Sequence, residues 1–590
     1  MVHDTVNMEE GASPSPRPFV GMVATPPAVA SQPSTRRPKW LRLATGLLVV
    51  CGIACVAIGA IVVYANHKND NKAGAIVSSL QQAKALKITL ELKRESMMYF
   101  GQPTADVYVF PLSSSGAKIT SQSSFQFDAV LALQHDNVQE RYVYVDHRAY
   151  YVKSQDGQVQ HAACLTASQV PPFSLAASAM ANAKVLDEAT VGDESLHAQS
   201  DCPGPDAQLL HLSFAGESFI FCSSGDTLTR ATGHDMNLVV TYLSDETLSD
   251  DVAASWPSLD IPTDVAGQPL QCDVLDTDSS VEAQESSLLD MATEITTTVM
   301  GARSASLMGA SCGCKTEKKP CLFVHGLGNP FVAPISDSFS LYWGDVHKHM
   351  PCCSSTKFVH FNTFKLGWND PSIQQDFCNA AVQVSGAKAG QPVGKIILVT
   401  HSMGNMIAGA AVAAGKCRFS KDVTWISSAG PMKGSKSANL FDRKCTEGGW
   451  NDLIKKPLEL IGICPPTPAF HSLLYQDSTD QNTHAALVAL QNVRRQYVTK
   501  TLCGVDDWGL NTIFSLPFKV VGEWTQHGDR NDGVVALGSC VEGIGMDGFG
   551  GATTSKNYLG RLNHIDLAFR NGDGWWGSDR KPVKWLECAL

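Results

Sequence analysis

The chain has 590 residues, of which 44% are hydrophobic and 17% charged, and its formal net charge is −11. One hydrophobic core does not support this length, so the sequence predicts at least two folded domains. The acidic balance, with a pI of about 5.8, argues against a nucleic-acid partner, because nucleic-acid binding usually needs a basic face. The composition indicates no cofactor and leaves the oligomeric state open.

The N-terminal part is not typical of a globular domain. Residues 1–42 are rich in Pro and Ser, and we expect a disordered cytoplasmic tail there. Leu43–Ala65 follows as 23 uncharged residues, enough for a transmembrane helix. Four basic residues between positions 36 and 42 predict a cytosolic N-terminus, hence a single-pass type II membrane protein whose bulk is extracellular or in the secretory-pathway lumen. The alternative is a cleaved signal peptide, whose apolar core is usually shorter and nearer the N-terminus.

Residues 67–275 are predicted to form a β-rich domain. Stretches such as KITLELKRE and ERYVYVDHRAYYVKS alternate apolar and polar residues, a pattern typical of half-buried antiparallel strands. No catalytic constellation occurs here, so two interpretations stay open: a spacer or assembly domain, and a curved sheet that holds a lipid or peptide. Four cysteines could staple the domain in any of three pairings: Cys164, Cys202, Cys222 and Cys272.

The cysteine distribution agrees with an oxidising compartment. Of the 18 cysteines, 16 lie after the apolar span, and they indicate a disulfide framework. The segment HKHMPCC, with His347, His349, Cys352 and Cys353, resembles a zinc site in composition, but disulfides are the favoured interpretation in such a compartment.

Residues 276–316 are predicted to be a linker, because they are rich in Ser and acidic residues. Leu288, Met291, Ile295 and Val299 recur at helical spacing, so we expect one amphipathic helix in this linker.

The second domain is predicted over residues 317–590 and begins with CLFVHGLGN, residues 321–329. This apolar run ending in His-Gly predicts a buried parallel strand followed by a tight loop. Such a loop can direct the backbone N–H of Leu327 into a site. Taken alone, the stretch is equally compatible with an ordinary strand-to-loop junction.

The stretch GKIILVTHSMGNMIAGAAVAAG predicts a nucleophile elbow. Lys395–Thr400 is the expected strand and Gly404–Ala414 a helix of small residues that can pack closely on a sheet. A sharp turn between them would expose the Ser402 hydroxyl, and the N–H of Met403 would complete an oxyanion hole. Thr400 stands where the first glycine of G-x-S-x-G belongs, so its side chain has to point away from the turn.

Candidates for the acid and the base follow later in the chain. The segment DVTWISSAG is expected to be the next parallel strand. Asp532 lies in a turn before a short apolar run, predicted to be a strand, and His564 follows 32 residues later. The order Ser402, Asp532, His564 is that of the α/β-hydrolases. The competing residues are Asp529, Asp506 and Asp507 for the acid and His471, His484 and His527 for the base, whereas His401 is expected to pack beside the elbow.

Five motifs in this order, FVHGLGN, VTHSMGN, SAGPMKGSKSA, NDGVV and NHID, resemble the secreted bacterial triacylglycerol lipases and related esterases of the α/β-hydrolase superfamily. The resemblance covers residues 320–570. It implies a mostly parallel α/β sheet, a nucleophile at Ser402, an acid at Asp532, a base at His564, and oxyanion N–H groups at Leu327 and Met403. In some of these lipases an acid at the position of Asp566 helps to hold a structural calcium, so Asp566 is a possible calcium ligand.

The distance between nucleophile and acid leaves room for an insertion. Residues 450–476 are interpreted either as a mobile lid over an acyl pocket or as a fixed cap helix, with Cys445 and Cys464 at its base. The sequence as a whole predicts a membrane-anchored hydrolase of carboxylic esters, above all lipid-like acyl esters. The alternatives are an acyltransferase or amidase with the same triad, and an inactive hydrolase fold that serves as a binding module.

Overall fold

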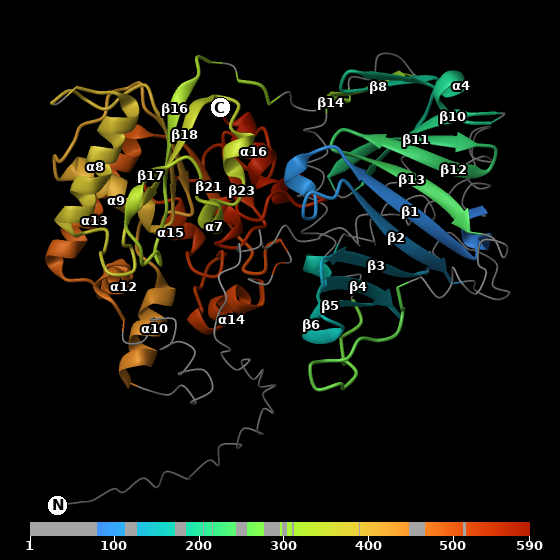
Figure 1. Ribbon diagram of the computed structural model, residues 1–590, viewed down its shortest axis with the longest axis horizontal. Coiled ribbons are helices and arrows are strands. Elements are labelled where there is room, and N and C mark those ends of the chain that lie inside the picture. Colours follow the sequence, from blue (N-terminus) through green and yellow to red (C-terminus); the bar gives the residue numbers. More distant parts are fainter. Residues whose placement is uncertain are drawn as a thin grey trace, which may run out of the picture.

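The computed structural model describes residues 79–112, 127–170, 184–275 without 205, 215 and 244–256, the pieces 296–297, 304–308 and 312–314, and 316–590 without 389, 448–465, 511 and 513–514 (Figure 1). The predicted tail 1–42 and the predicted span Leu43–Ala65 lie outside these residues. Within the described part of the chain, no helix combines the length and apolarity that crossing a membrane requires.

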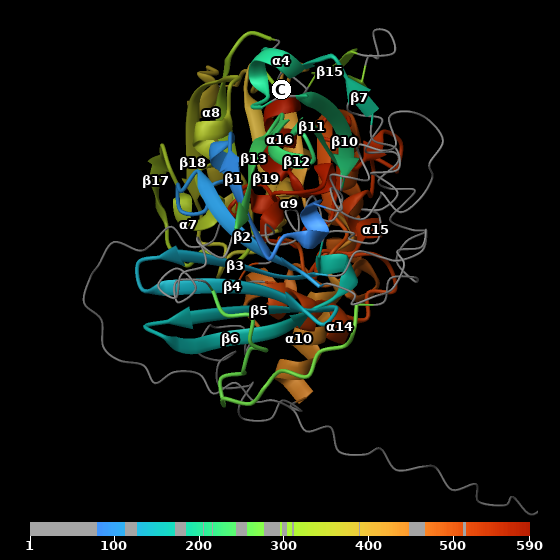
Figure 2. The same ribbon diagram turned by 90° about the vertical axis from the view of Figure 1, so that its right-hand side faces the viewer.

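The first domain is built on an antiparallel sheet of eleven strands, in the order β6-β5-β4-β3-β2-β1-β13-β12-β11-β10-β7 (Figures 1 and 2). Tight turns connect its hairpins: β3 and β4 close at Asp136, and β5 and β6 close at Asp156, each with a positive φ near 50° that short polar residues tolerate. Alternate side chains of most strands fill the main core, as the sequence predicts, and intervening residues such as Val130 and Leu209 are buried in smaller clusters. The strands are β1 (Ala85–Leu92), β2 (Thr104–Pro111), β3 (Phe127–His135), β4 (Val138–Val145), β5 (Arg148–Gln155), β6 (Gln158–Leu165), β7 (Lys184–Leu186), β10 (Gln208–Phe214), β11 (Glu217–Ser224), β12 (Thr227–Gly233) and β13 (Met236–Leu243).

A second, four-stranded sheet in the order β14-β15-β8-β9 draws on the predicted linker. Its strands are β8 (Glu188–Val191), β9 (Glu194–His197), β14 (Thr296–Thr297) and β15 (Ser304–Met308), and the short helix α4 (Ala198–Asp201) follows β9. The amphipathic helix expected through Ile295 and Val299 is wrong at 296–297, which form a strand. The reason is the run ITTTV, whose five β-branched residues favour extended backbone over helix.

The second domain contains an eight-stranded sheet in the order β17-β18-β16-β19-β20-β21-β23-β22, parallel except for the β17–β18 pair. This is the mostly parallel α/β sheet that the resemblance implies. Its strands are β16 (Lys319–Val324), β17 (Ala333–Ser336), β18 (Cys353–His360), β19 (Ile397–His401), β20 (Thr424–Ser428), β21 (Val498–Gly504), β22 (Phe549–Gly550) and β23 (Asn557–Gly560).

Helices cover both faces of this sheet (Figure 1). One face packs against α8 (Pro371–Ser385), α9 (Met403–Ala413) and α13 (Gln481–Tyr497). The other face packs against α7 (Ser340–Trp343) and α16 (Pro582–Cys588). The remaining helices are α10 (Lys436–Glu447), α12 (Pro468–His471), α14 (Ser515–Thr525) and α15 (Leu537–Cys540).

The two domains share a buried, charged interface. Lys581 Nζ lies 2.6 Å from an oxygen of Asp235 and 2.6 Å from an oxygen of Glu217, and the Trp575 indole N–H donates to the Met97 carbonyl at 2.6 Å. Trp575 belongs to the core of the first domain. The C-terminal segment of the second domain is therefore part of the packing of the first.

Seven disulfides lie among the described residues, which favours an extracellular or lumenal location. They are Cys164–Cys272, Cys202–Cys222, Cys312–Cys588, Cys314–Cys352, Cys321–Cys353, Cys378–Cys417 and Cys503–Cys540. Cys352 and Cys353 are thus bonded to other cysteines rather than arranged as zinc ligands. Cys445 is disulfide-bonded as well, but the predicted link to Cys464 lies outside the described residues, as does most of the predicted lid.

Candidate active site

Ser402 lies at a strained turn between β19 and α9. It caps α9 with φ 54° and ψ −130°, a conformation that costs a non-glycine residue energy and persists only where the surroundings impose it. Close packing imposes it here. A Cβ atom on Gly404 would lie 2.4 Å from the Val324 carbonyl oxygen, and one on Gly326 would lie 2.5 Å from the Cβ of Ser402. The glycines therefore let helix and loop approach the serine.

The three predicted catalytic side chains lie together. His564 Nε2 is 2.9 Å from Ser402 Oγ, and His564 Nδ1 is 2.8 Å from Asp532 Oδ2. Ser402 is 6% exposed, His564 8% and Asp532 1%. Because the carboxylate can only accept at Nδ1, the neutral imidazole carries its proton there and offers a lone pair at Nε2 to the serine hydroxyl.

Local structure orients the acid and the base. Asp532 Oδ1 accepts the N–H groups of Val534, at 3.0 Å, and Val535, at 2.7 Å. The His564 N–H donates to the Asp532 carbonyl at 2.9 Å. The strand expected after Asp532 is wrong: Val534 and Val535 lie in bends that lead into α15, because both backbone N–H groups turn back to the carboxylate.

The competing acids and bases lie elsewhere. Asp529 accepts the N–H of Gly538 at 2.8 Å. His527 contacts the Ser437 hydroxyl at 3.3 Å, and His471 pairs with Asp442. His484 is exposed on α13. None of these side chains contacts Ser402 in the described structure.

The two predicted oxyanion donors belong to segments that meet at Ser402: the start of α9 and the loop after β16, whose Gly326 lies against the serine. Met403 is the first residue of α9, so its N–H is not used within the helix. Leu327 follows Gly326 in the loop after β16. The helix N-terminus and this loop together resemble the donor arrangement that stabilises a tetrahedral intermediate.

A hydrogen-bond network explains the threonine in the glycine position. The Thr400 hydroxyl donates to Asn405 Oδ1 at 2.5 Å and accepts the Trp425 indole N–H at 2.8 Å. The Asn405 amide donates in turn to the Ser428 carbonyl at 2.8 Å and to the Ser402 carbonyl at 3.0 Å. The side chain of Thr400 thus points away from the turn and ties β19, α9 and β20 together. Sequence reasoning identified the space requirement but not this network.

Asp566 has a structural role. Its carboxylate accepts the Leu510 N–H at 2.9 Å, the Asn563 N–H at 3.1 Å and the Asn571 amide at 2.6 Å. Burial raises the pKa of Asp566 to about 6. Both carboxylate oxygens are taken by protein N–H groups, and in the described residues no cluster of three His, Cys, Asp or Glu side chains that could hold a metal occurs.

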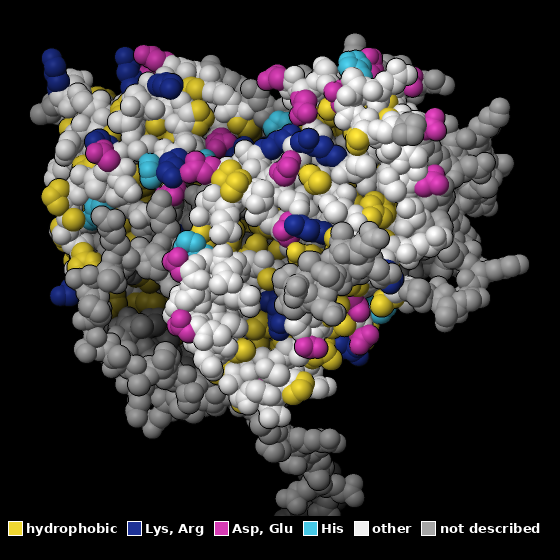
Figure 3. Space-filling view, turned by 45° about the vertical axis from the view of Figure 1, so that its right-hand side comes forward, with side chains coloured by type: hydrophobic (Ala, Val, Ile, Leu, Met, Phe, Trp, Pro, Cys, Tyr) yellow, Lys and Arg dark blue, Asp and Glu magenta, His cyan; other side chains and the backbone are white. Residues whose placement is uncertain are grey.

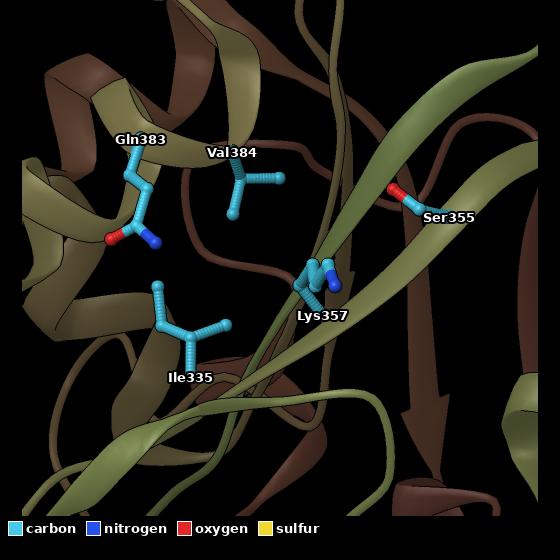
Figure 4. Close-up of a pocket in the computed structure, with 5 residues that line it drawn as sticks. All are labelled: Ile335, Ser355, Lys357, Gln383 and Val384. Carbon is cyan, nitrogen blue, oxygen red and sulfur yellow. The ribbon is translucent and has the colours of Figure 1, made fainter.

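A small pocket of about 180 Å³ lies apart from the triad. Ile335 of β17, Ser355 and Lys357 of β18, and Gln383 and Val384 of α8 line it (Figure 4). No residue of the triad contributes to it. The surface in Figure 3 mixes acidic and basic side chains. In the loop after β16, the apolar residues Phe331 and Val332 are 67% and 75% exposed.

Known proteins resemble this chain in structure only, and their sequence identity to it is low. No family model matches the sequence, and no curated protein matches it closely. The C-terminal half is similar in structure to α/β-hydrolases. The phospholipase PlaB from Legionella pneumophila is 15% identical, with 38% of this chain and 44% of that chain covered and a TM-score of 0.23. The metagenomic carboxyl esterase MGS0156 is 15% identical, with 47% and 75% covered and a TM-score of 0.28. The Staphylococcus hyicus lipase is 12% identical, with 46% and 94% covered and a TM-score of 0.26. The chain spans less than half the length of the Legionella phospholipase.

Proposed function

We propose that this protein is a serine hydrolase that cleaves carboxylic esters through Ser402, His564 and Asp532. The observation that supports it is the unbroken series of contacts from Ser402 Oγ through the His564 ring to Asp532 Oδ2, at 2.9 and 2.8 Å, on a serine held at a positive φ. A serine in an ordinary turn is not expected to have a strained backbone, nor a histidine partner that a buried acid orients.

The mechanism follows from these contacts. His564 Nε2 takes the hydroxyl proton as Ser402 Oγ attacks the ester carbonyl carbon, and Asp532 stabilises the imidazolium that forms. The N–H groups of Leu327 and Met403 bind the oxyanion, each worth roughly 3–4 kcal/mol in other serine hydrolases. His564 returns the proton to the leaving alkoxide. Water, activated by the same imidazole, then releases the acid from the acyl-enzyme.

The proposed substrate is an ester of a lipid-like acyl chain. Two apolar side chains lie near the reacting groups: the Phe518 ring is 6.4 Å from the His564 ring, and Leu327 packs against the apolar core of the α9 side. The exposed Phe331 and Val332 extend this apolar character to the surface. We also propose that the predicted type II anchor at Leu43–Ala65 tethers the enzyme to its membrane.

The test is labelling with a fluorophosphonate probe together with turnover of short-chain and long-chain p-nitrophenyl esters. Wild type should be labelled and should turn over the long-chain ester faster than the short-chain ester. Ser402→Ala should lose both the labelling and the turnover. The matched control is Ser427→Ala, because Ser427 is a buried serine on β20 whose hydroxyl has no hydrogen-bond partner in the described structure. Labelling that persists in Ser402→Ala would refute the assignment.

A further inference from the structure

The loop after β16 carries Gly326 and the proposed oxyanion donor Leu327, and we call it the oxyanion loop. Two hydrogen bonds hold the carbonyl of Gly326 in this loop. It accepts His325 Nδ1–H at 2.9 Å and the Thr363 hydroxyl at 2.7 Å. His325 Nε2 accepts the Phe361 N–H at 3.0 Å, so the neutral ring carries its proton at Nδ1. In a trans peptide the carbonyl and the next N–H point in opposite directions. Fixing the Gly326 carbonyl therefore fixes the direction of the Leu327 N–H.

The N–H of the same glycine begins a second series of hydrogen bonds. Gly326 N–H donates to the Tyr342 hydroxyl at 2.7 Å. That hydroxyl donates to His401 Nδ1 at 2.6 Å, and His401 Nε2–H donates to the carbonyl of His564 at 2.9 Å. The direction of each bond is determined, because a backbone N–H can only donate and a backbone carbonyl can only accept.

Burial keeps this series in one protonation state. Desolvation lowers the pKa of His401 well below its ordinary value, and it raises the pKa of Tyr342. His401 is therefore neutral, with one donor and one acceptor nitrogen, and Tyr342 keeps its proton. The series has no second arrangement in which all its groups remain satisfied.

We infer that Tyr342 and His401 are positioning residues that couple the oxyanion loop to the main chain of the catalytic histidine, so that both are held in place before substrate binds. Neither residue touches Ser402 Oγ or the proposed oxyanion. The inference rests on the proposed function, since it assigns these residues to the same site. It adds that α7, which carries Tyr342, sets the alignment of base and oxyanion donor relative to each other.

The decisive variant is Tyr342→Phe, which keeps the ring and removes the hydroxyl. Gly326 N–H and His401 Nδ1 then lose their common partner, and we expect kcat to fall roughly 10- to 100-fold because the oxyanion donor and base lose their alignment, with KM nearly unchanged. The matched control is Tyr558→Phe, which removes a buried hydroxyl that also makes two hydrogen bonds, to Ser578 and Lys581, and which should lower stability without lowering kcat.

Fluorophosphonate titration separates positioning from structural damage. In Tyr342→Phe the number of reactive serines per molecule should stay at the wild-type value, while the rate constant of labelling falls in parallel with kcat. If Tyr342→Phe folds poorly, Thr363→Val tests the same loop. It removes one donor to the Gly326 carbonyl and the acceptor of the Asn329 N–H without changing side-chain shape, and it should give the same signature. A reduced number of reactive serines with an unchanged rate constant would overturn the inference.

A double-mutant cycle tests the link through His401. His401→Gln can keep a donor toward the His564 carbonyl but removes the Nδ1 acceptor. The double variant with Tyr342→Phe should lose little more kcat than the more impaired single variant, because both changes break the same series of hydrogen bonds. Fully additive losses would overturn the inference. If wild type itself is neither labelled nor active, the proposed function fails; if wild type is labelled and Tyr342→Phe labels at the same rate, only this inference fails.

Discussion

Thr400 and Asn405 are joined beneath the nucleophile turn by a hydrogen bond of 2.5 Å between the threonine hydroxyl and the amide oxygen. The two residues lie on either side of Ser402 in the sequence, one at the end of β19 and one in the first turn of α9. A glycine at position 400 could not make this bond. The threonine side chain therefore links the end of β19 to the first turn of α9.

Thr400→Gly should therefore destabilise the protein although it completes G-x-S-x-G. The change leaves the Trp425 indole N–H and Asn405 Oδ1 unpaired in the core, at a cost of about 2–4 kcal/mol in the free energy of unfolding, and kcat should not rise. Denaturant unfolding and ester turnover measure the two quantities. Thr400→Ser keeps the hydroxyl and is the control; a Thr400→Gly protein as stable as Thr400→Ser would contradict the role of the network.

Asp532→Asn should reduce kcat by roughly 10⁴-fold, the loss seen when the acid of such a triad can no longer hold the imidazole in the useful tautomer. The fold should survive, because the amide oxygen can still accept the Val534 and Val535 N–H groups. Asp529→Asn is the control, since this neighbouring carboxylate bonds the Gly538 N–H instead. Equal losses in the two variants would reassign the acid.

Stability should depend on the neutral His325. Burial lowers the pKa of His325 to about 4, whereas in the unfolded chain it is near 6.5. The unfolded state therefore binds more protons between these values, and this contribution to stability is complete above pH 6.5 and is lost as pH falls toward 4. Asp566, with its pKa raised to about 6, acts in the opposite direction, so the comparison must be made between variants.

The relevant variant is His325→Asn, which keeps an N–H donor for the Gly326 carbonyl but does not titrate. Between pH 7 and pH 5 its free energy of unfolding should fall by about 2 kcal/mol less than that of wild type. Denaturant titrations at the two pH values measure the difference. Replacing the exposed His484 in the same way should leave the wild-type pH dependence intact, and an identical pH dependence in His325→Asn would disprove the prediction.

Lys581→Met should strongly destabilise the contact between the domains. It leaves the buried Glu217 carboxylate without its cation and leaves Asp235 with one lysine, Lys584, and breaking a buried ion pair costs about 3–5 kcal/mol. The thermal midpoint of the full chain is the measurement. Lys357→Met removes an ion pair to the exposed Asp337 and should cost no more than about 1 kcal/mol. Equal midpoints for both variants would mean that the interface charges contribute little.

The elements that could be predicted from the sequence are those with strong local patterns. The alternation in residues 67–275 predicted antiparallel strands, and the apolar runs around Ser402 predicted the β19–α9 turn. Sequence reasoning failed where long-range pairing decides the outcome: Asp235 and Lys581 each look like solvent-exposed charges, and only folding brings them together. The same holds for Tyr342, whose sequence context YWGD gives no sign that its hydroxyl would reach His401.

The pairing of Asp235 with Lys581 also has a consequence for biosynthesis. The lysine is made 346 residues after the aspartate, which at about 5–20 residues per second corresponds to a delay on the order of tens of seconds. Throughout that interval the first domain has emerged without Lys581 and Lys584, the two lysines that pair with the buried Asp235 carboxylate. The buried charge cluster of the N-terminal half is therefore completed only after the C-terminal segment has been made.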